Sequence, residues 1–203
     1  MATIYDLKPA FQNRLRPLTR KLADGGFTAN QVTLAALALS LATGTLLAAM
    51  GRTRPEMYLM LPAVLLIRMA LNAIDGMLAR EHGMQSPLGA VLNELSDVVS
   101  DAALYLPFAL LPGVSPTWVV LASVGALLTE MAGVVAVQIG ASRRYDGPMG
   151  KSDRAFVFGA AGLAIGAGVV PGTWLNGLFG LVLALTLLTV VNRSRRALQE
   201  AAE

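Results

Sequence analysis

The stretch MYLMLPAVLLIRMALNAIDGMLA, residues 57–79, decides the fold of this chain. It is as long as the run of about 20 mostly apolar residues that a helix needs to cross the hydrocarbon core of a bilayer. It also carries Arg68, Asn72 and Asp75, and ionisable groups are costly at membrane depth unless they are paired or serve a function. The stretch therefore predicts a transmembrane helix with one polar, functional face.

Five further apolar blocks of similar length accompany this one. They cover residues 29–49, 87–111, 116–140, 152–170 and 174–191, and short loops join them. The 203 residues are 55% hydrophobic and 14% charged, whereas an ordinary soluble domain has about 25% charged residues. We therefore predict an all-α fold, an integral membrane bundle of six transmembrane helices in which neighbours are antiparallel.

The segment before the first block has the pattern of a basic amphipathic helix. Apolar residues recur at every third or fourth position from Ile4 to Leu22, with Lys8, Arg14, Arg16, Arg20 and Lys21 between them. This pattern is typical of a helix that lies in the membrane interface. We predict a single membrane domain over residues 1–203, composed of an interfacial helix at 1–27, six spans at 28–192 and a cytoplasmic tail at 193–203.

The placement of positive charge predicts the orientation of the bundle. With six spans, most of the 16 lysines and arginines lie on the side of the two termini. Only Arg52 and Arg54 lie on the other side, and Arg68 lies inside a span. Because cytoplasmic loops are enriched in Lys and Arg, both termini are expected to be cytoplasmic, in a membrane of the bacterial inner-membrane type.

Two consecutive spans carry polar side chains that can meet. Asn72 and Asp75 lie on one face of the second span, while Asn93 and Asp97 lie on one face of the third. A short link folds these spans into a hairpin, which brings the two faces together at similar depth. Carboxylate and amide oxygens that converge there would suit Mg²⁺ or Mn²⁺, which prefer oxygen ligands and bind substrate phosphates.

The spacing of these residues resembles a known signature. Asn72, Asp75-Gly76, Ala79-Arg80, Gly89, Asn93 and Asp97 match DxxDGxxAR(x8)GxxxDxxxD, the motif of the CDP-alcohol phosphotransferase (CDP-alcohol phosphatidyltransferase) family. The resemblance extends over nearly the whole chain. It implies transfer of a substituted phosphate, usually phosphatidyl, from CDP-diacylglycerol or a similar CDP-alcohol to an alcohol in phospholipid biosynthesis, with release of CMP. It also implies a homodimer.

The resemblance further implies roles for the matched residues. Metal would be bound at the four acidic positions, which are Asn72, Asp75, Asn93 and Asp97 here, and Asp97 would also be the general base. The donor would bind along Gly76, Ala79, Arg80 and Gly89. Asn stands at the first and third acidic positions, so two family carboxylates are missing. Asp101, one turn beyond Asp97, is better placed than Glu94 to compensate.

The acceptor side is less defined by the sequence. Lys151 and Arg154 begin the fifth span and suit either a pocket for an anionic acceptor or a membrane anchor, whereas Arg143 and Arg144 suit anchors. Arg68 could contact substrate or pair with Asp101 or Glu130. The basic charge has a membrane explanation, so nucleic-acid binding gains no support.

Two other functional classes stay open at this level. The Asn substitutions would suit a catalytically impaired relative that binds lipid or nucleotide without turnover. Intramembrane Asp, Glu and Arg also mark ion pathways, so a small membrane transporter is the third hypothesis. A transporter would move its substrate without releasing CMP.

Overall fold

The computed structural model describes residues 8–203 and consists of helices joined by short loops. Ile4 and Leu7 of the predicted amphipathic pattern lie outside these residues. The elements in chain order are α1 (Lys8–Asp24), α2 (Ala29–Met50), η2 (Pro55–Leu59), α3 (Met60–Glu81), α4 (Pro87–Tyr105), η3 (Leu106–Leu110), α5 (Pro116–Gln138), α6 (Lys151–Gly166) and α7 (Thr173–Glu200). The predicted all-α fold is confirmed.

Four helical segments of the described chain are long and apolar enough to cross a membrane. They are α2, the continuous segment Pro55–Glu81, α5 and α7. The two remaining predicted spans differ from these for physical reasons. The α4 helix contains Glu94, Asp97 and Asp101 within its 19 residues, and α6 is only 16 residues long. The count of six spans therefore stays a prediction, as does the interfacial position of α1.

Side-chain caps begin two of the helices where the sequence places Ser or Thr. At the start of α2, the Thr28 hydroxyl accepts from the backbone N–H of Gln31, and the side-chain oxygen of Gln31 accepts from the backbone N–H of Thr28. At the start of α4, Ser86 accepts from the N–H of Gly89, with Pro87 in the first turn. Such caps satisfy backbone donors that have no partner inside the helix.

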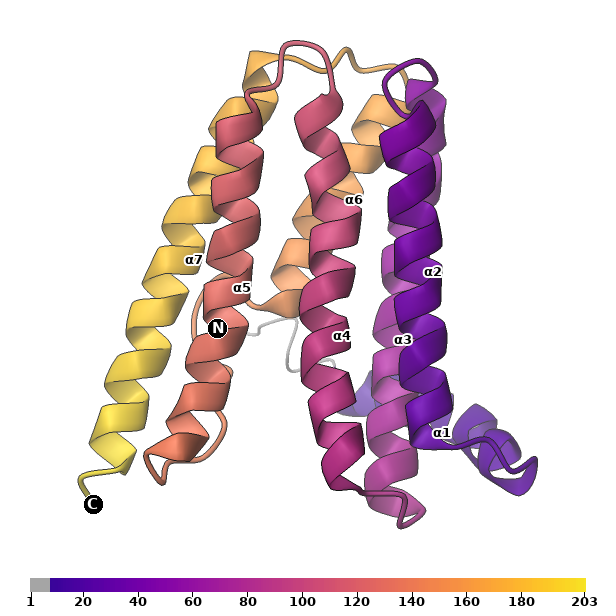
Figure 1. The fold of residues 1–203 in the computed structure, drawn as a ribbon, viewed down its shortest axis with the longest axis vertical. Helices are drawn as coiled ribbons and strands as arrows, with labels where there is room; N and C mark the ends of the chain where they lie inside the picture. Colours follow the sequence, from indigo (N-terminus) through magenta and orange to yellow (C-terminus); the bar gives the residue numbers. More distant parts are fainter. Residues whose placement is uncertain (1–7) are drawn as a thin grey trace.

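The helices form an elongated bundle in which α2 runs beside α4 and α5 runs beside α7 (Figure 1). Glycine permits both close approaches. A Cβ atom at Gly44 of α2 would lie 2.2 Å from the carbonyl oxygen of Ala103 in α4. One at Gly125 of α5 would lie 2.4 Å from the hydroxyl of Thr186 in α7. Small residues of this kind drive helix packing where lipid removes the usual hydrophobic force.

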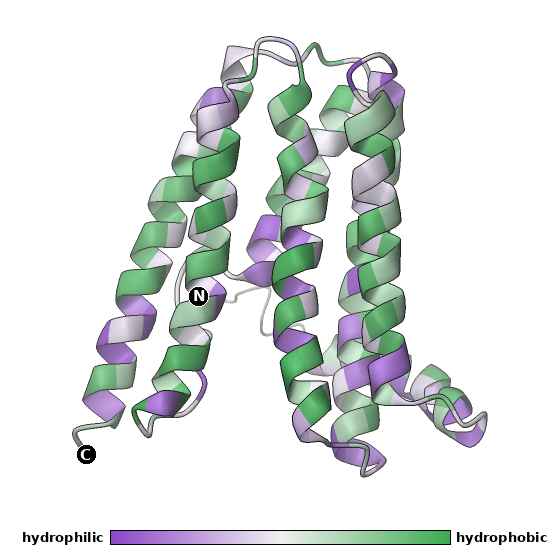
Figure 2. Ribbon diagram, in the orientation of Figure 1, coloured by the Kyte–Doolittle hydropathy of each residue, from purple (hydrophilic) through white to green (hydrophobic). Residues whose placement is uncertain are grey.

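Apolar and polar residues separate along the length of the bundle (Figure 2). Green, hydrophobic ribbon covers most of α2, α5 and α7, while purple residues gather toward the lower end and at the start of α6. Aromatic side chains fill part of the core between the helices, with Tyr105 stacked on Phe158 and Phe158 stacked on Phe179. The aromatic core thus fills the bundle above the polar residues at the start of α6.

The loop between α5 and α6 folds back into the bundle, so α6 begins well above the lower ends of its neighbours (Figure 1). The backbone N–H of Met149, near the end of this loop, donates to the hydroxyl of Thr189 in the middle of α7. Asp153 then accepts from the N–H of Gly150 and caps the new helix. This re-entrant loop explains why α6 is short, and it delivers the first residues of α6 to the interior.

Candidate active site

A cavity of about 1370 Å³ opens between the α3–α4 hairpin and the re-entrant loop before α6. Nine of the residues singled out from the sequence line it: Asn72, Asp75, Gly76, Ala79, Arg80, Gly89, Asn93, Asp97 and Lys151. Of the residues expected to bind metal, donor or acceptor, only Arg68 and Arg154 do not line it. The structure therefore brings the whole motif together around one space, as the hairpin prediction requires.

The first carboxylate of the site, Asp75, is held from α2. It is 5% exposed, and the hydroxyl of Thr33 donates to its Oδ2 at 2.8 Å. Thr33 and its neighbour Asn30 both line the cavity. Neither residue was singled out from the sequence. Their signal is a polar pair at helical spacing, i and i+3, near the start of a mostly apolar helix.

The second carboxylate, Asp97, receives three donors on one oxygen atom. The amide nitrogen of Asn72 lies 2.8 Å from Asp97 Oδ1, and Arg68 Nη2 lies 3.4 Å from it. The ammonium of Lys151 pairs with the same oxygen. Asp97 is thus oriented by α3 on one side and by the first residue of α6 on the other.

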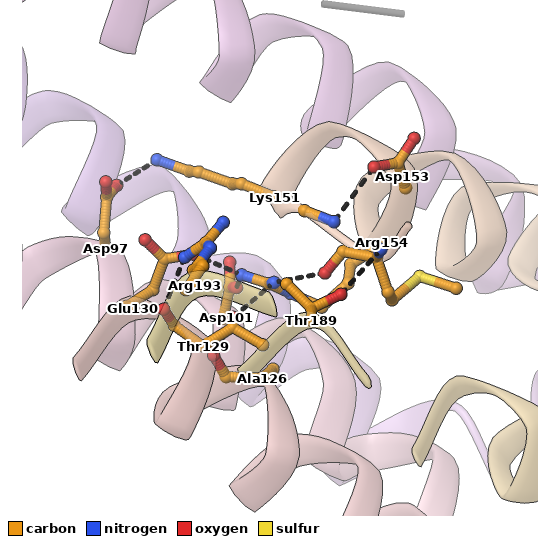
Figure 3. A network of polar contacts seen from close by, with 12 residues as sticks. Asp97, Asp101, Ala126, Thr129, Glu130, Lys151, Asp153, Arg154, Thr189 and Arg193 are labelled. Atoms are coloured by element: carbon orange, nitrogen blue, oxygen red, sulfur yellow. Dashed lines mark hydrogen bonds and ion pairs between the residues drawn. The ribbon is translucent and has the colours of Figure 1, made fainter. Parts of the chain in front are cut away.

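Asp101 lies one turn beyond Asp97 and belongs to a buried ion-pair network (Figure 3), which Arg68 links to Asp97. Its Oδ1 accepts from Arg68 and its Oδ2 from Arg154, at 2.5 and 3.1 Å. Both arginines are buried, at 2% and 0% exposure. Because both carboxylate oxygens are bonded to guanidinium groups and the residue does not line the cavity, Asp101 is not positioned to replace a missing metal ligand.

Glu130 of α5 joins this network through Arg154 and not through Arg68. Its Oε1 accepts from Arg154 at 2.8 Å, and its Oε2 lies 3.5 Å from Arg143. Arg143 also pairs with Glu94. Of the predicted pairings, Arg68 with Asp101 is therefore present, whereas Glu130 takes other partners. Arg143, expected to be an anchor, lines the cavity.

The cavity also contains a cation that the sequence did not single out, Arg193 of α7. It is 3% exposed and lines the cavity. Its guanidinium donates to the backbone carbonyl oxygens of Thr129 and Asp146. Within residues 8–203, no carboxylate forms an ion pair with it. Sequence analysis assigned Arg193 to a cytoplasmic tail because the apolar block ends at Val191, whereas α7 continues unbroken to Glu200.

Two motif glycines lie under polar side chains. A Cβ at Gly76 would lie 2.8 Å from Arg80 Nη2, and one at Gly89 would lie 2.8 Å from the side-chain oxygen of Asn30. Because glycine has no side chain, both polar groups can rest against the helix backbone at the cavity wall. Each glycine therefore allows a polar side chain to lie against the helix backbone. Both glycines belong to the expected donor-binding residues.

The oxygen donors of the cavity fit a hard divalent cation. The carboxylates of Asp75 and Asp97 and the amides of Asn72 and Asn93 line the same space, and oxygen is the donor that Mg²⁺ and Mn²⁺ prefer. Within the described residues, however, no group of three or more His, Cys, Asp and Glu side chains is arranged to hold a metal. Amide or substrate oxygens would therefore have to complete the coordination.

Comparisons with known proteins find similarity over nearly the whole chain. The family model for CDP-alcohol phosphatidyltransferase matches residues 27–192. Inner membrane protein YnbA of Escherichia coli K12 is 50% identical over 201 residues, which is 99% of each chain. The similarity therefore extends beyond the motif to the full length of the fold.

Solved structures of the phosphatidylinositol phosphate synthase PgsA1 of Mycobacterium tuberculosis have a similar fold. The one with CDP-DAG bound has a TM-score of 0.71 at 23% identity, covering 91% of this chain and 92% of that one. The one in complex with manganese and citrate has a TM-score of 0.70 at 22% identity, covering 92% and 91%.

The ion-pair network predicts different roles for neighbouring acids. We expect Asp101→Asn to destabilise the protein by about 3–5 kcal/mol, because it leaves Arg68 and Arg154 without their shared carboxylate. Thermal unfolding in detergent measures the loss. The control is Glu81→Gln, which removes an exposed ion pair with Arg16 and should change stability little, because solvent and salt screen exposed ion pairs. Equal, small effects of both substitutions would contradict a structural role for Asp101.

Proposed function

The chain belongs to the CDP-alcohol phosphatidyltransferase family, whose members transfer a phosphatidyl group from a CDP-alcohol in phospholipid synthesis, and we propose that its cavity is the active site. One observation carries this proposal. All four positions of the metal-binding motif, with the carboxylates Asp75 and Asp97 among them, line one space. The substrates would be CDP-diacylglycerol or a similar CDP-alcohol and an alcohol acceptor, and CMP would be released.

The donor is proposed to lie along the α3–α4 hairpin. Gly76, Ala79, Arg80 and Gly89 line the cavity there, and Arg80 can offer several N–H donors to phosphate oxygens. The similar fold of the M. tuberculosis synthase that was solved with CDP-DAG bound supports this placement. The guanidinium now folded over Gly76 would move toward the diphosphate when the donor enters.

Asp97 is proposed as the general base. The acceptor hydroxyl gives its proton to the Asp97 carboxylate, and its oxygen forms a bond to the phosphatidyl phosphorus. The bond between that phosphorus and the oxygen that bridges the two phosphates of the donor breaks, and CMP leaves with the electron pair of this bond. Asn72 and Arg68 hold the Asp97 carboxylate in place from α3. A bound Mg²⁺ or Mn²⁺ would neutralise the diphosphate and improve CMP as a leaving group.

The acceptor is proposed to be an anionic alcohol. Arg193 supports this proposal because it is a buried guanidinium at the cavity wall with no carboxylate partner in residues 8–203. An anion would compensate a charge that is otherwise costly to bury. Lys151 also faces the cavity. A direct contact of Arg68 or Arg154 with the acceptor stays a prediction, since both guanidinium groups pair with Asp101.

The protein is integral to the membrane, and its placement is proposed as follows. Besides the four apolar segments, we propose that α4 and α6 span the bilayer, with their charges turned to the cavity or paired inside the bundle, and that α1 lies in the interface. Polar residues gather toward the lower end of the bundle (Figure 2), which would face the cytoplasm, and both termini are proposed to be cytoplasmic. A homodimer, as the family resemblance implies, is also proposed.

Catalysis provides the first test. Asp97→Asn should reduce CMP release by about 10²-fold or more, because it removes the general base, while the variant stays folded in detergent. The matched control is Glu81→Gln at the exposed end of α3, which should retain activity. Near-normal CMP release by Asp97→Asn would exclude Asp97 as the base. Donor binding by the unsubstituted protein without any CMP release would instead indicate an impaired relative.

The acceptor pocket provides a second test. Arg193→Met should raise the KM for an anionic acceptor by about tenfold or more and leave the KM for the CDP-donor nearly unchanged. The control is Arg196→Met, one helical turn along α7, where the side chain is 60% exposed. Equal turnover of neutral and phosphorylated alcohols by the unsubstituted enzyme would contradict an anion pocket.

Orientation can be tested by labelling, because the chain has no cysteine. A membrane-impermeant thiol reagent applied from outside should label Thr53→Cys and Thr117→Cys, and should miss His82→Cys and Tyr145→Cys. Labelling of Tyr145→Cys from outside would place the cavity opening on the other face of the membrane.

A further inference from the structure

The site is short of carboxylates, and the surrounding acids do not make up the deficit. Of the four motif positions, only Asp75 and Asp97 carry a negative charge. Every other acid near the cavity already has a partner: Asp101 with Arg68 and Arg154, Glu130 with Arg154, Glu94 with Arg143, Asp146 with Arg144, and Asp153 with the N–H of Gly150. Two divalent cations would therefore share two available carboxylates.

Asn72 presents a donor to Asp97. Its amide nitrogen lies 2.8 Å from Asp97 Oδ1, which is the distance of an ordinary hydrogen bond. An aspartate at position 72 would instead place two carboxylates in contact, and a cation would have to lie between them to offset their repulsion. The amide N–H of Asn72 instead donates a hydrogen bond to Asp97. The pair is thus stable without a metal between its members.

The ammonium of Lys151 occupies the other side of Asp97. It pairs with the same Oδ1 atom, and Figure 3 shows the side chain extending from the start of α6 to Asp97. Lys151 lines the cavity and its side chain is 25% exposed. A lysine ammonium is a compact charge with three donors on a flexible stem. It can therefore stay near Asp97 and also bond to an incoming phosphate oxygen.

The charge balance favours one metal ion together with this lysine. One divalent cation and one ammonium against the carboxylates of Asp75 and Asp97 leave a single positive charge to meet the diphosphate. Two divalent cations together with the same ammonium would leave three positive charges beside one another in a partly buried cavity. Repulsion between like charges is strong there, because the effective dielectric constant is well below that of water.

We propose that the active site binds a single divalent cation and that the Lys151 ammonium, held on Asp97 beside Asn72, takes the place of a second one. The proposal rests on the function proposed above and concerns the donor diphosphate, which Lys151 would contact next to the metal. It also gives a reason for the two asparagines. With Lys151 present, carboxylates at positions 72 and 93 are not needed to balance a second cation.

Manganese binding tests the proposal without measuring turnover. The purified protein in detergent is titrated with Mn²⁺ in the presence of CDP, and both stoichiometry and electron paramagnetic resonance are recorded. We expect one Mn²⁺ per chain with the spectrum of an isolated ion. The double variant Asn72→Asp/Asn93→Asp should bind two Mn²⁺ that are magnetically coupled.

Substitutions of Lys151 test its part. Lys151→Met should tighten Mn²⁺ binding without CDP by about tenfold, because a neighbouring positive charge is gone, and should weaken CDP binding at saturating Mn²⁺ by a similar factor. Lys151→Arg should preserve both affinities within a few-fold. The matched control is Lys21→Met in α1, which lies away from the cavity and should change neither.

Each contrary result has a distinct meaning. Two coupled Mn²⁺ ions in the unsubstituted protein with CDP would overturn the single-cation site and leave the proposed function intact. Unchanged affinities in Lys151→Met would overturn the role of Lys151. Failure of the unsubstituted protein to bind either Mn²⁺ or CDP would overturn this proposal and the proposed function together.

Discussion

The pairing of the Asp101 carboxylate with Arg68 and Arg154 is the interaction on which the rest of the structure depends. Charged groups inside an apolar bundle must be paired because each unpaired charge costs several kcal/mol. This carboxylate joins α3, α4 and α6 at one point. Asp97 lies one turn away on α4, and Lys151 lies three residues before Arg154 on α6. Fixing the ion pair therefore fixes the two side chains that meet at the cavity.

The re-entrant loop follows from the same constraint. Arg154 can reach Asp101 only if α6 begins inside the bundle, and the hydrogen bonds of Met149 and Asp153 hold the loop at that level. The loop also forms the wall of the cavity opposite the α3–α4 hairpin. A buried structural network and a partly open reactive site thus share adjacent turns of the same helices. In the network, Asp101 and Glu130 are bonded to buried arginines, whereas Asp75, Asp97 and Arg193 line the cavity.

Much of this could be predicted from the sequence because it depends on local pattern. Apolar blocks predicted the helices, and motif spacing predicted that Asn72, Asp75, Asn93 and Asp97 share one space. The rest depends on tertiary packing. Asp101 was expected to supplement the metal ligands. Its two carboxylate oxygens instead form ion pairs with Arg68 and Arg154. Arg193 and Thr33 were missed because their partners come from segments distant in sequence.

The central claim is that this cavity transfers a phosphatidyl group by metal-assisted chemistry. The most direct measurement is CMP release by the purified, unsubstituted protein from CDP-diacylglycerol, with a panel of neutral and phosphorylated alcohols, before and after removal of divalent metal. The account predicts CMP release that requires an alcohol acceptor, disappears with a chelator and returns with Mg²⁺ or Mn²⁺. CMP release that persists at full rate in the chelator would contradict it, as would its absence with every acceptor and either metal.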